Sequence, residues 1–454
     1  MTIGFSSCER FILEKMSETK IPGLSIAVIK DEELIYVRGF GFKDIASGSP
    51  TTPRTLFGIG SVTKSFTALA ILQLVEAGKI NLDDPIKKYM PWEIRPFGEE
   101  IRIHHLLTHS SGIPALAYAE AYIRGILGLD DYWLPLSTPE DVITFMRDAG
   151  DWVHCKPGER FFYLNEGYVL LGHIISKVSN MSYETYVKES ILKPLKMERT
   201  FFSRTEVESD GDFATPYIID KEGKHIPKEF PYGITADGGL ISNVIDLSNY
   251  LRMYINRGEL EGKKIISRQL LEKMETGYIS ENYELFGGES YGYGWAIIPN
   301  FYGYKLVNHS GSVGVHTAYA GYIPEKRVGV AILANAAGYP LKYIGMYVLA
   351  HLLGENPEKM PMIKNDRILS KLEGTYKTYK GTYKLEIKKS GSYLIAIQKD
   401  KYREIMTPLV PEEIEEDKAI FSMISNWRKI AVEFTIKRGK IELIFERYKL
   451  RKAE

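Results

Sequence analysis

Two residues, Ser61 and Lys64, have the types and the spacing that nucleophilic catalysis requires. Residues three apart on a helix lie on the same face, so the Lys64 amine can reach the Ser61 hydroxyl. A lysine that accepts or shares a proton activates a serine, and a helix N-terminus favours negative charge nearby. The pair therefore predicts acyl transfer through a covalent Ser61 intermediate.

The surrounding residues distinguish this pair from two other serines that precede a lysine by three positions. Those serines, Ser17 and Ser190, are followed by Pro22 and Pro194, and a proline blocks the helix that either would need. Ser61 alone follows a glycine and opens a long apolar helical pattern. A capping serine beside an exposed lysine is the alternative interpretation, since this motif is weak when it stands alone.

Tyr163 and Asn165 form a second candidate motif. An ammonium such as that of Lys64 would lower the pKa of Tyr163 from its usual value near ~10, which would make the tyrosine a general base. Asn165 offers a donor and an acceptor for a substrate amide. The alternative for Tyr163 is an interior tyrosine whose hydroxyl is satisfied.

The third candidate motif, from His309 through Ser310 and Gly311 to Ser312, ends one predicted strand and precedes the next. A glycine on an edge strand lets a substrate backbone lie alongside. A backbone N–H of this motif, together with that of Ser61, could form an oxyanion hole. The alternative for His309 is a histidine at a strand end without a role.

In this order and at these separations, the three motifs resemble those of the class C β-lactamase, D-aminopeptidase and esterase family, which is penicillin-binding-protein-like. Stretches 106–112, 237–242 and 291–295 match as well, and the resemblance covers about residues 5–355. Within the family, the chain resembles most the archaeal CubicO-type serine proteases that carry a lipocalin-like C-terminal domain.

The resemblance implies a role for each motif residue. Ser61 would be the acyl-forming nucleophile, and Lys64 and Tyr163 would share proton transfer. Asn165 would bind the substrate amide, and the Ser312 N–H would face the oxyanion.

At His309 the chain departs from the β-lactamases, which carry a lysine there. The fixed charge of that lysine helps to hold a carboxylate, so the histidine weakens a β-lactamase interpretation. A histidine at this position is familiar in D-aminopeptidases and in some esterases of the group.

The pattern of apolar residues predicts the elements that position these motifs. Helical and loop segments fill residues 81–290, between early and late strands, and consecutive strands usually lie side by side. We therefore expect an α+β fold, an antiparallel sheet flanked by helices with a helical subdomain. The predicted strands are 24–30, 34–40, 292–298, 304–308, 315–323 and 327–334, and a helix is predicted at 340–354.

The character of the sequence changes near residue 360, where prolines are followed by short alternating apolar runs. Such runs, separated by polar turns, indicate a small barrel or sandwich. We expect a hydrolase domain over residues 1–360, a linker at 361–370 and an all-β, lipocalin-like barrel over 371–454.

Composition excludes several classes of function. The chain has 454 residues with 58 basic and 58 acidic side chains, which argues against nucleic acid as a main partner. No apolar run reaches the ~20 residues of a membrane span, and the N-terminus lacks a secretion signal. We expect a cytoplasmic protein that needs neither cofactor nor metal.

The first hypothesis is a serine peptidase, and the resemblance implies a short peptide, with or without D-residues, as its substrate. An esterase or a weak β-lactamase would use the same serine, and pocket shape rather than chemistry would separate them. A third alternative is a scaffold or sensor that binds but barely turns over. The resemblance also implies a homo-oligomer, with an octamer as the candidate state.

Overall fold

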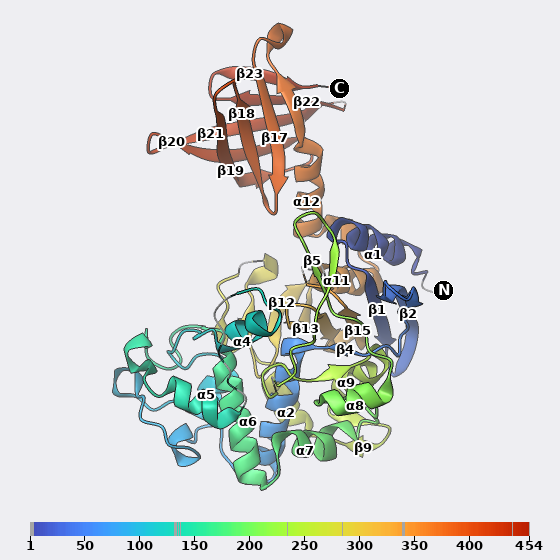
Figure 1. The fold of residues 1–454 in the computed structure, drawn as a ribbon, viewed down its shortest axis with the longest axis vertical. Coiled ribbons are helices and arrows are strands. Elements are labelled where there is room, and N and C mark those ends of the chain that lie inside the picture. Colours follow the sequence, from blue (N-terminus) through green and yellow to red (C-terminus); the bar gives the residue numbers. More distant parts are fainter. Residues whose placement is uncertain are drawn as a thin grey trace. The chain divides into compact units, whose positions relative to one another are not determined.

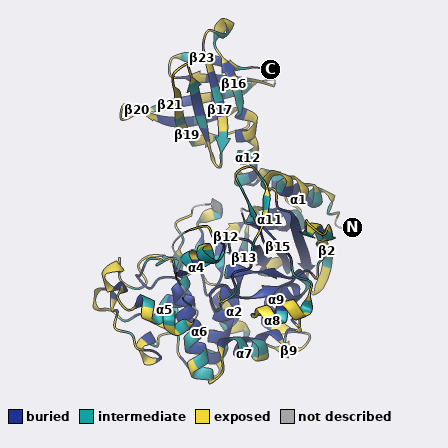
Figure 2. Ribbon diagram, in the orientation of Figure 1, coloured by how far each residue is buried: buried dark blue, intermediate teal, exposed yellow. Residues whose placement is uncertain are grey.

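The computed structural model describes residues 4–453, except 131–133, 135, 137, 234, 284, 338–340 and 438. The chain divides into two compact units, Met1–Glu355 and Asn356–Glu454 (Figure 1). Each unit has its own buried core, shown in dark blue in Figure 2.

The first unit is built on a nine-stranded sheet whose strand pairs are all antiparallel. Its order is β10-β11-β12-β13-β14-β15-β1-β2-β3. The α+β prediction is confirmed, although β12 begins at Ala296 and residues 292–295 precede it. The strands are β1 (Gly23–Lys30), β2 (Glu33–Asp44), β3 (Ser49–Pro50), β10 (Ile279–Ser280), β11 (Ser290–Tyr291), β12 (Ala296–Phe301), β13 (Tyr304–Ser312), β14 (Thr317–Ile323) and β15 (Val328–Ala334).

The sheet joins distant parts of the chain at its centre, because β1 pairs with β15 from Leu24 opposite Ala334 to Lys30 opposite Val328. Every residue of β14 and β15 is buried, and every residue of β1 except Lys30. Strands that are covered on both faces read as continuous apolar runs rather than as alternating ones.

Helices α9 (Val244–Ile255) and α11 (Leu341–Leu352) cover the two faces of this centre. Gly345 of α11 lies against the ring of Tyr319, whereas Ile255 of α9 lies against Gly329, the partner of Tyr322. Tyr319 and Tyr322 are three residues apart on one strand, so they point to opposite faces. Helix α1 (Ser6–Thr19) packs on α11.

Helix α2 (Thr63–Glu76) lies at the centre of a helical region that fills the rest of the first unit (Figure 1). Thr63 to Leu72 are buried without interruption, as expected of a helix that is surrounded by protein. It packs on α6 (Asn165–Ser179), α7 (Tyr183–Val187) and α10 (Arg268–Met274). The unit also contains α3 (Ile103–Leu107), α4 (Tyr118–Ile126), α5 (Pro139–Met146) and α8 (Arg204–Asp210).

The second unit is a closed eight-stranded barrel, in agreement with the all-β prediction. Apolar side chains such as Leu394, Phe421 and Phe434 fill its interior. The strands are β16 (Gly374–Lys377), β17 (Lys384–Ser390), β18 (Tyr393–Lys399), β19 (Glu404–Ile414), β20 (Lys418–Ser425), β21 (Arg428–Lys437), β22 (Lys440–Phe445) and β23 (Tyr448–Lys452).

The structure differs from the sequence-based expectation at residues 361–370. Instead of a linker, this segment forms most of helix α12 (Pro361–Leu372). Pro361 stands at the first helical position, where a proline is tolerated, so it starts the helix rather than breaking it. Ile368, Leu369 and Leu372 belong to the barrel core, and their burial accounts for the helix.

None of the helices in the described part of the chain has the length and apolar character needed to cross a membrane.

Candidate active site

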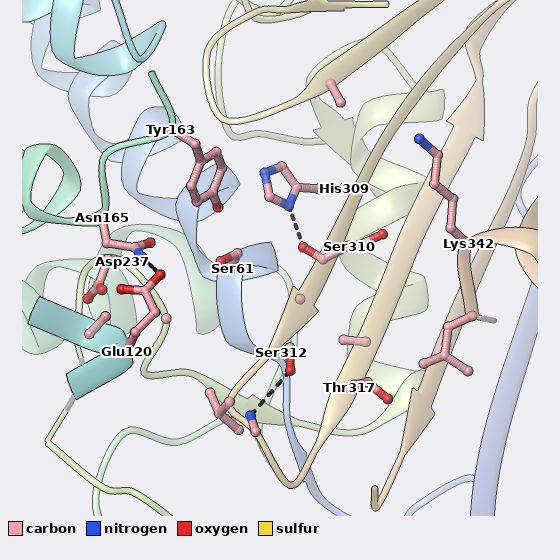
Figure 3. A pocket seen from close by; sticks show the side chains of 18 of the residues that line it. Ser61, Glu120, Tyr163, Asn165, Asp237, His309, Ser310, Ser312, Thr317 and Lys342 are labelled. Carbon is pink, nitrogen blue, oxygen red and sulfur yellow. Dashed lines mark hydrogen bonds between the residues drawn. The ribbon is translucent and has the colours of Figure 1, made fainter. Parts of the chain in front are cut away.

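Ser61 lies in a single 3₁₀ turn, Gly60–Val62, that leads into α2. It is half-buried at the wall of a cavity of about 840 Å³ (Figure 3). The same cavity is lined by Tyr163, Asn165 and the four residues from His309 to Ser312. The structure thus brings together the three motifs that the sequence singled out.

Lys64 lies one turn further along α2 and is fully buried. Its Nζ atom is 3.1 Å from Oγ of Ser61. The same atom donates to Oδ1 of Asn165 and to the backbone oxygen of Asp237, both at 2.7 Å. These two acceptors can take both N–H bonds of a neutral amine, which leaves its lone pair for the Ser61 hydroxyl.

The electrostatics of the site favour that neutral amine. Burial lowers the pKa of Lys64 to about 8, although the carboxylates of Asp237, Glu120 and Glu166 oppose the shift. A base whose pKa lies close to the operating pH is efficient, because much of it is unprotonated and it still accepts a proton readily.

Tyr163 corrects one expectation from the sequence. Burial raises the pKa of Tyr163 well above its usual value, and a hydrogen bond with Ser61 only partly offsets this. The prediction that this pKa is lowered is wrong, because the effect of burial dominates. Lys64 lies over the ring face, 4.9 Å from the centroid. The hydroxyl of Tyr163 is therefore neutral, and it can donate a hydrogen bond.

His109 holds the loop that carries Tyr163, a role that the sequence did not reveal. Its Nδ1 accepts from the backbone N–H of Leu164 at 3.0 Å, and its backbone oxygen accepts from Phe162 N–H at 2.8 Å. Its ring lies 4.2 Å from that of Tyr163. The matching stretch at 106–112 was the available signal, but it did not indicate what His109 contacts.

The end of β13 forms the opposite wall of the site. On the β12 side, pairing ends with Asn308 opposite Ala296, so residues 309–312 pair only with β14 and leave an open edge. This backbone lies against the turn of Ser61. A Cβ atom on Gly311 would collide with the Ile59 carbonyl and lie 3.0 Å from Ser61 N.

A Cβ atom on Gly60 would lie 2.5 Å from the backbone nitrogen of Ser312. Gly60 also has φ +52°, which glycine adopts without strain. The backbone nitrogens of Ser61 and Ser312 therefore lie on two segments in direct contact. Such a pair can serve as an oxyanion hole.

His309 supplies a hydrogen-bonding group to this wall and carries no fixed charge. Burial, with the nearby charge of Lys64, lowers the pKa of His309 to about 3. Its Nδ1 is 2.6 Å from the Ser310 carbonyl oxygen, which can only accept, so Nδ1 carries the proton. Nε2 then accepts from the Tyr291 hydroxyl at 2.9 Å.

Two acidic residues beside Asn165 were not singled out from the sequence as site residues. Glu120, on α4, accepts from Nδ2 of Asn165 at 3.3 Å (Figure 3). Asp237 is buried next to Lys64. Both acidic residues line the cavity. Asp237 begins a matching stretch, but no sequence signal marked Glu120.

The residues that the structure describes offer no set of ligands for a metal ion. No three His, Cys, Asp or Glu side chains in this part of the chain are grouped so that they could hold an ion. The site consists of a serine, a buried amine, a neutral phenol and backbone N–H groups. This arrangement can carry out acyl transfer with protein groups alone.

Comparison with protein-family models decides the family. The β-lactamase model matches residues 8–353, and a second model, the Pab87 octamerisation domain, matches residues 357–451. The chain belongs to the β-lactamase family. This family of serine hydrolases contains the relatives that the sequence motifs indicated.

Similar proteins support the assignment to the β-lactamase family. The octameric penicillin-binding protein homologue from Pyrococcus abyssi is 56% identical, with a TM-score of 0.95 over 98% of this chain and 99% of that one. Protein flp from Staphylococcus aureus is 30% identical over 72% of this chain, which covers 62% of that relative's length.

A D-stereospecific amidohydrolase from a Streptomyces species shares the fold alone, at 23% identity and a TM-score of 0.59. That match covers 73% of this chain and 94% of the other.

Proposed function

We propose that this chain is a serine peptidase that hydrolyses short peptides, including peptides with D-residues, through a Ser61 acyl-enzyme. The observation that carries the proposal is the environment of Lys64. A fully buried amine lies 3.1 Å from the Ser61 hydroxyl, and two acceptors hold its remaining hydrogens. Its pKa of about 8 suits a general base near neutral pH.

In the proposed mechanism, Lys64 takes the proton of Ser61 as Oγ attacks the substrate carbonyl. The developing oxyanion accepts from the N–H groups of Ser61 and Ser312. The C–N bond then breaks, and the leaving amine takes the proton from Lys64 through the neutral hydroxyl of Tyr163. In the second half of the reaction, water takes the place of Ser61 as the attacking group, and Ser61 takes the place of the amine as the leaving group. The carboxylic acid is released and Ser61 is restored.

The neutral His309 distinguishes the candidate substrates. A β-lactam carries a carboxylate, and the histidine offers it no fixed positive charge because its pKa is about 3. Peptides and esters need no cation at that position. We therefore place the β-lactam last among the three substrate classes.

The test is a mass-spectrometric time course on matched peptides that differ only in L or D configuration, with Ser61→Ala as the blank. We expect cleavage by the wild type only, and the faster set defines the stereochemical preference. Cleavage of esters alone would replace the peptidase with an esterase. A stable adduct at Ser61 without turnover would indicate a scaffold or sensor.

We also propose that the chain assembles into a homo-octamer through its barrel. The support is the match of residues 357–451 to the Pab87 octamerisation domain and the 56% identity to an octameric homologue. Trp427, at the turn between β20 and β21, is 100% exposed, and a tryptophan is a typical anchor of protein interfaces. Analytical ultracentrifugation tests the proposal.

A further inference from the structure

Among the charged side chains that line the cavity, an acidic one is free to contact a substrate, whereas the basic ones are held in ion pairs. Its two cationic lining residues are already paired, Arg124 with Asp130 at 2.8 Å and Lys342 with Glu289 at 3.0 Å. Glu120, in contrast, forms no ion pair with any residue that the structure describes. Its one recorded partner is the neutral amide of Asn165.

Asp237 provides the second, independent observation. It is only 2% exposed and lines the cavity, and its Oδ1 has no hydrogen-bond partner in the described chain. Its Oδ2 accepts from the Tyr118 hydroxyl at 2.8 Å, so this carboxylate is held in place with one oxygen unused. A buried carboxylate oxygen without a donor is costly, and an incoming donor removes that cost.

Helix α4 fixes the two acids relative to the nucleophile. Tyr118 begins this helix, and its backbone N–H donates to Glu166 while its hydroxyl donates to Asp237. Glu120 follows two residues later and contacts Asn165, which in turn accepts from Lys64. The acids therefore lie on the Asn165 side of the site, where Figure 3 shows Glu120 and Asp237 together.

From this arrangement we propose that Glu120 and Asp237 bind the free α-ammonium of the substrate residue that acylates Ser61, which would make the enzyme an aminopeptidase. The inference rests on the proposed Ser61 hydrolase. The α-nitrogen of an acyl residue is two bonds from the scissile carbonyl carbon. A carbonyl at Ser61 thus brings the ammonium within reach of groups around Asn165. An N-acylated residue offers no charge to them.

The test compares alanyl-p-nitroanilide with its N-acetylated form, in both configurations, using the full-length protein. We expect the wild type to prefer the free amine by about tenfold or more in kcat/KM, and Glu120→Gln to reduce this preference by roughly fivefold. Glu120→Lys should reverse it. The matched control is Glu281→Gln, which removes an acid beside Lys342 and should leave the preference unchanged.

Equal rates on both forms, with Ser61-dependent turnover, would overturn the ammonium site and leave the peptidase intact. An unchanged preference in both Glu120 variants would overturn it as well. If no anilide is cleaved, the peptidase proposal fails instead. The corresponding alanyl methyl esters then measure the same preference through the rate of Ser61 acylation, read by intact mass.

Discussion

The amine of Lys64 lies over the face of the Tyr163 ring, 4.9 Å from its centroid, and its hydrogen bonds go elsewhere. They reach Ser61, Asn165 and the backbone of Asp237. Since the tyrosine is neutral and the amine has a pKa of about 8, the two side chains have different tasks. In the proposed mechanism, Lys64 accepts the proton of Ser61, and Tyr163 donates toward the leaving group.

Replacing each of these two residues separates their tasks. Lys64→Met keeps most of the length of the side chain and removes the base, so we expect kcat/KM to fall by roughly 10³-fold or more. Tyr163→Phe removes one donor, and we expect a smaller loss, about 10²-fold. Steady-state rates on the best peptide measure both. A larger loss in Tyr163→Phe would make the tyrosine the base.

The pH dependence of kcat/KM follows from the lowered pKa of Lys64. The active form is the neutral amine, so the rate should rise with pH and level off above about 8. Below that value it should fall tenfold per unit. His309 should add no step between pH 5 and 8, because its pKa is about 3.

An acetylated substrate isolates this titration from recognition of an ammonium. On it, Glu120→Gln should move the inflection to lower pH, because Glu120 is one of the anions that raise the pKa of Lys64. A flat profile from pH 6 to 9 would contradict Lys64 as the base.

Gly311 should be sensitive to the smallest possible addition. In Gly311→Ala the new methyl group meets the Ile59 carbonyl and approaches Ser61 N, so β13 must move away from the nucleophile. We expect kcat/KM to fall by about 10²-fold or more, as for the loss of an oxyanion donor. Gly150→Ala is the matched control, since a Cβ atom there meets no neighbour and the backbone is not left-handed. An active Gly311→Ala would show that β13 can accommodate the new methyl group without loss of catalysis.

Trp427 should determine the oligomeric state of the chain. A buried charge at an interface without a partner costs several kcal/mol, so Trp427→Asp should dissociate the proposed octamer into smaller species. Trp152, 69% exposed on the first unit, provides the control substitution, which should change nothing. Sedimentation velocity distinguishes the species. An octamer that survives Trp427→Asp would exclude this turn from the contact.

The spacing of motif residues was enough to predict that Ser61 and Lys64 lie within reach of each other. Ser61 and Lys64 are one helical turn apart, so helical geometry brings their side chains together independently of the rest of the chain. The strands at 24–30 and 327–334 were also predicted, because continuous apolar runs identify buried strands without knowledge of their partners. Their pairing with each other was not predicted.

What could not be predicted depends on contacts between distant segments. The pKa of Tyr163 is set by its burial, and no local pattern reports burial of a single tyrosine. Glu120 meets Asn165 across 45 positions, on a helix whose sequence carries no catalytic pattern. Helix α12 was missed because the prolines near residue 360 suggested a linker, whereas Pro361 occupies the first helical position.

The pairing of β1 with β15 bears on how the protein is made. Residues 24–30 leave the ribosome early, yet their partner at 328–334 is translated some three hundred residues later. Until then this apolar strand has β2 on one side and an open edge on the other. Contacts between residues so far apart in sequence form slowly, and aggregation-prone surface stays exposed until they form. We therefore expect the nascent chain to depend on a chaperone until β15 emerges.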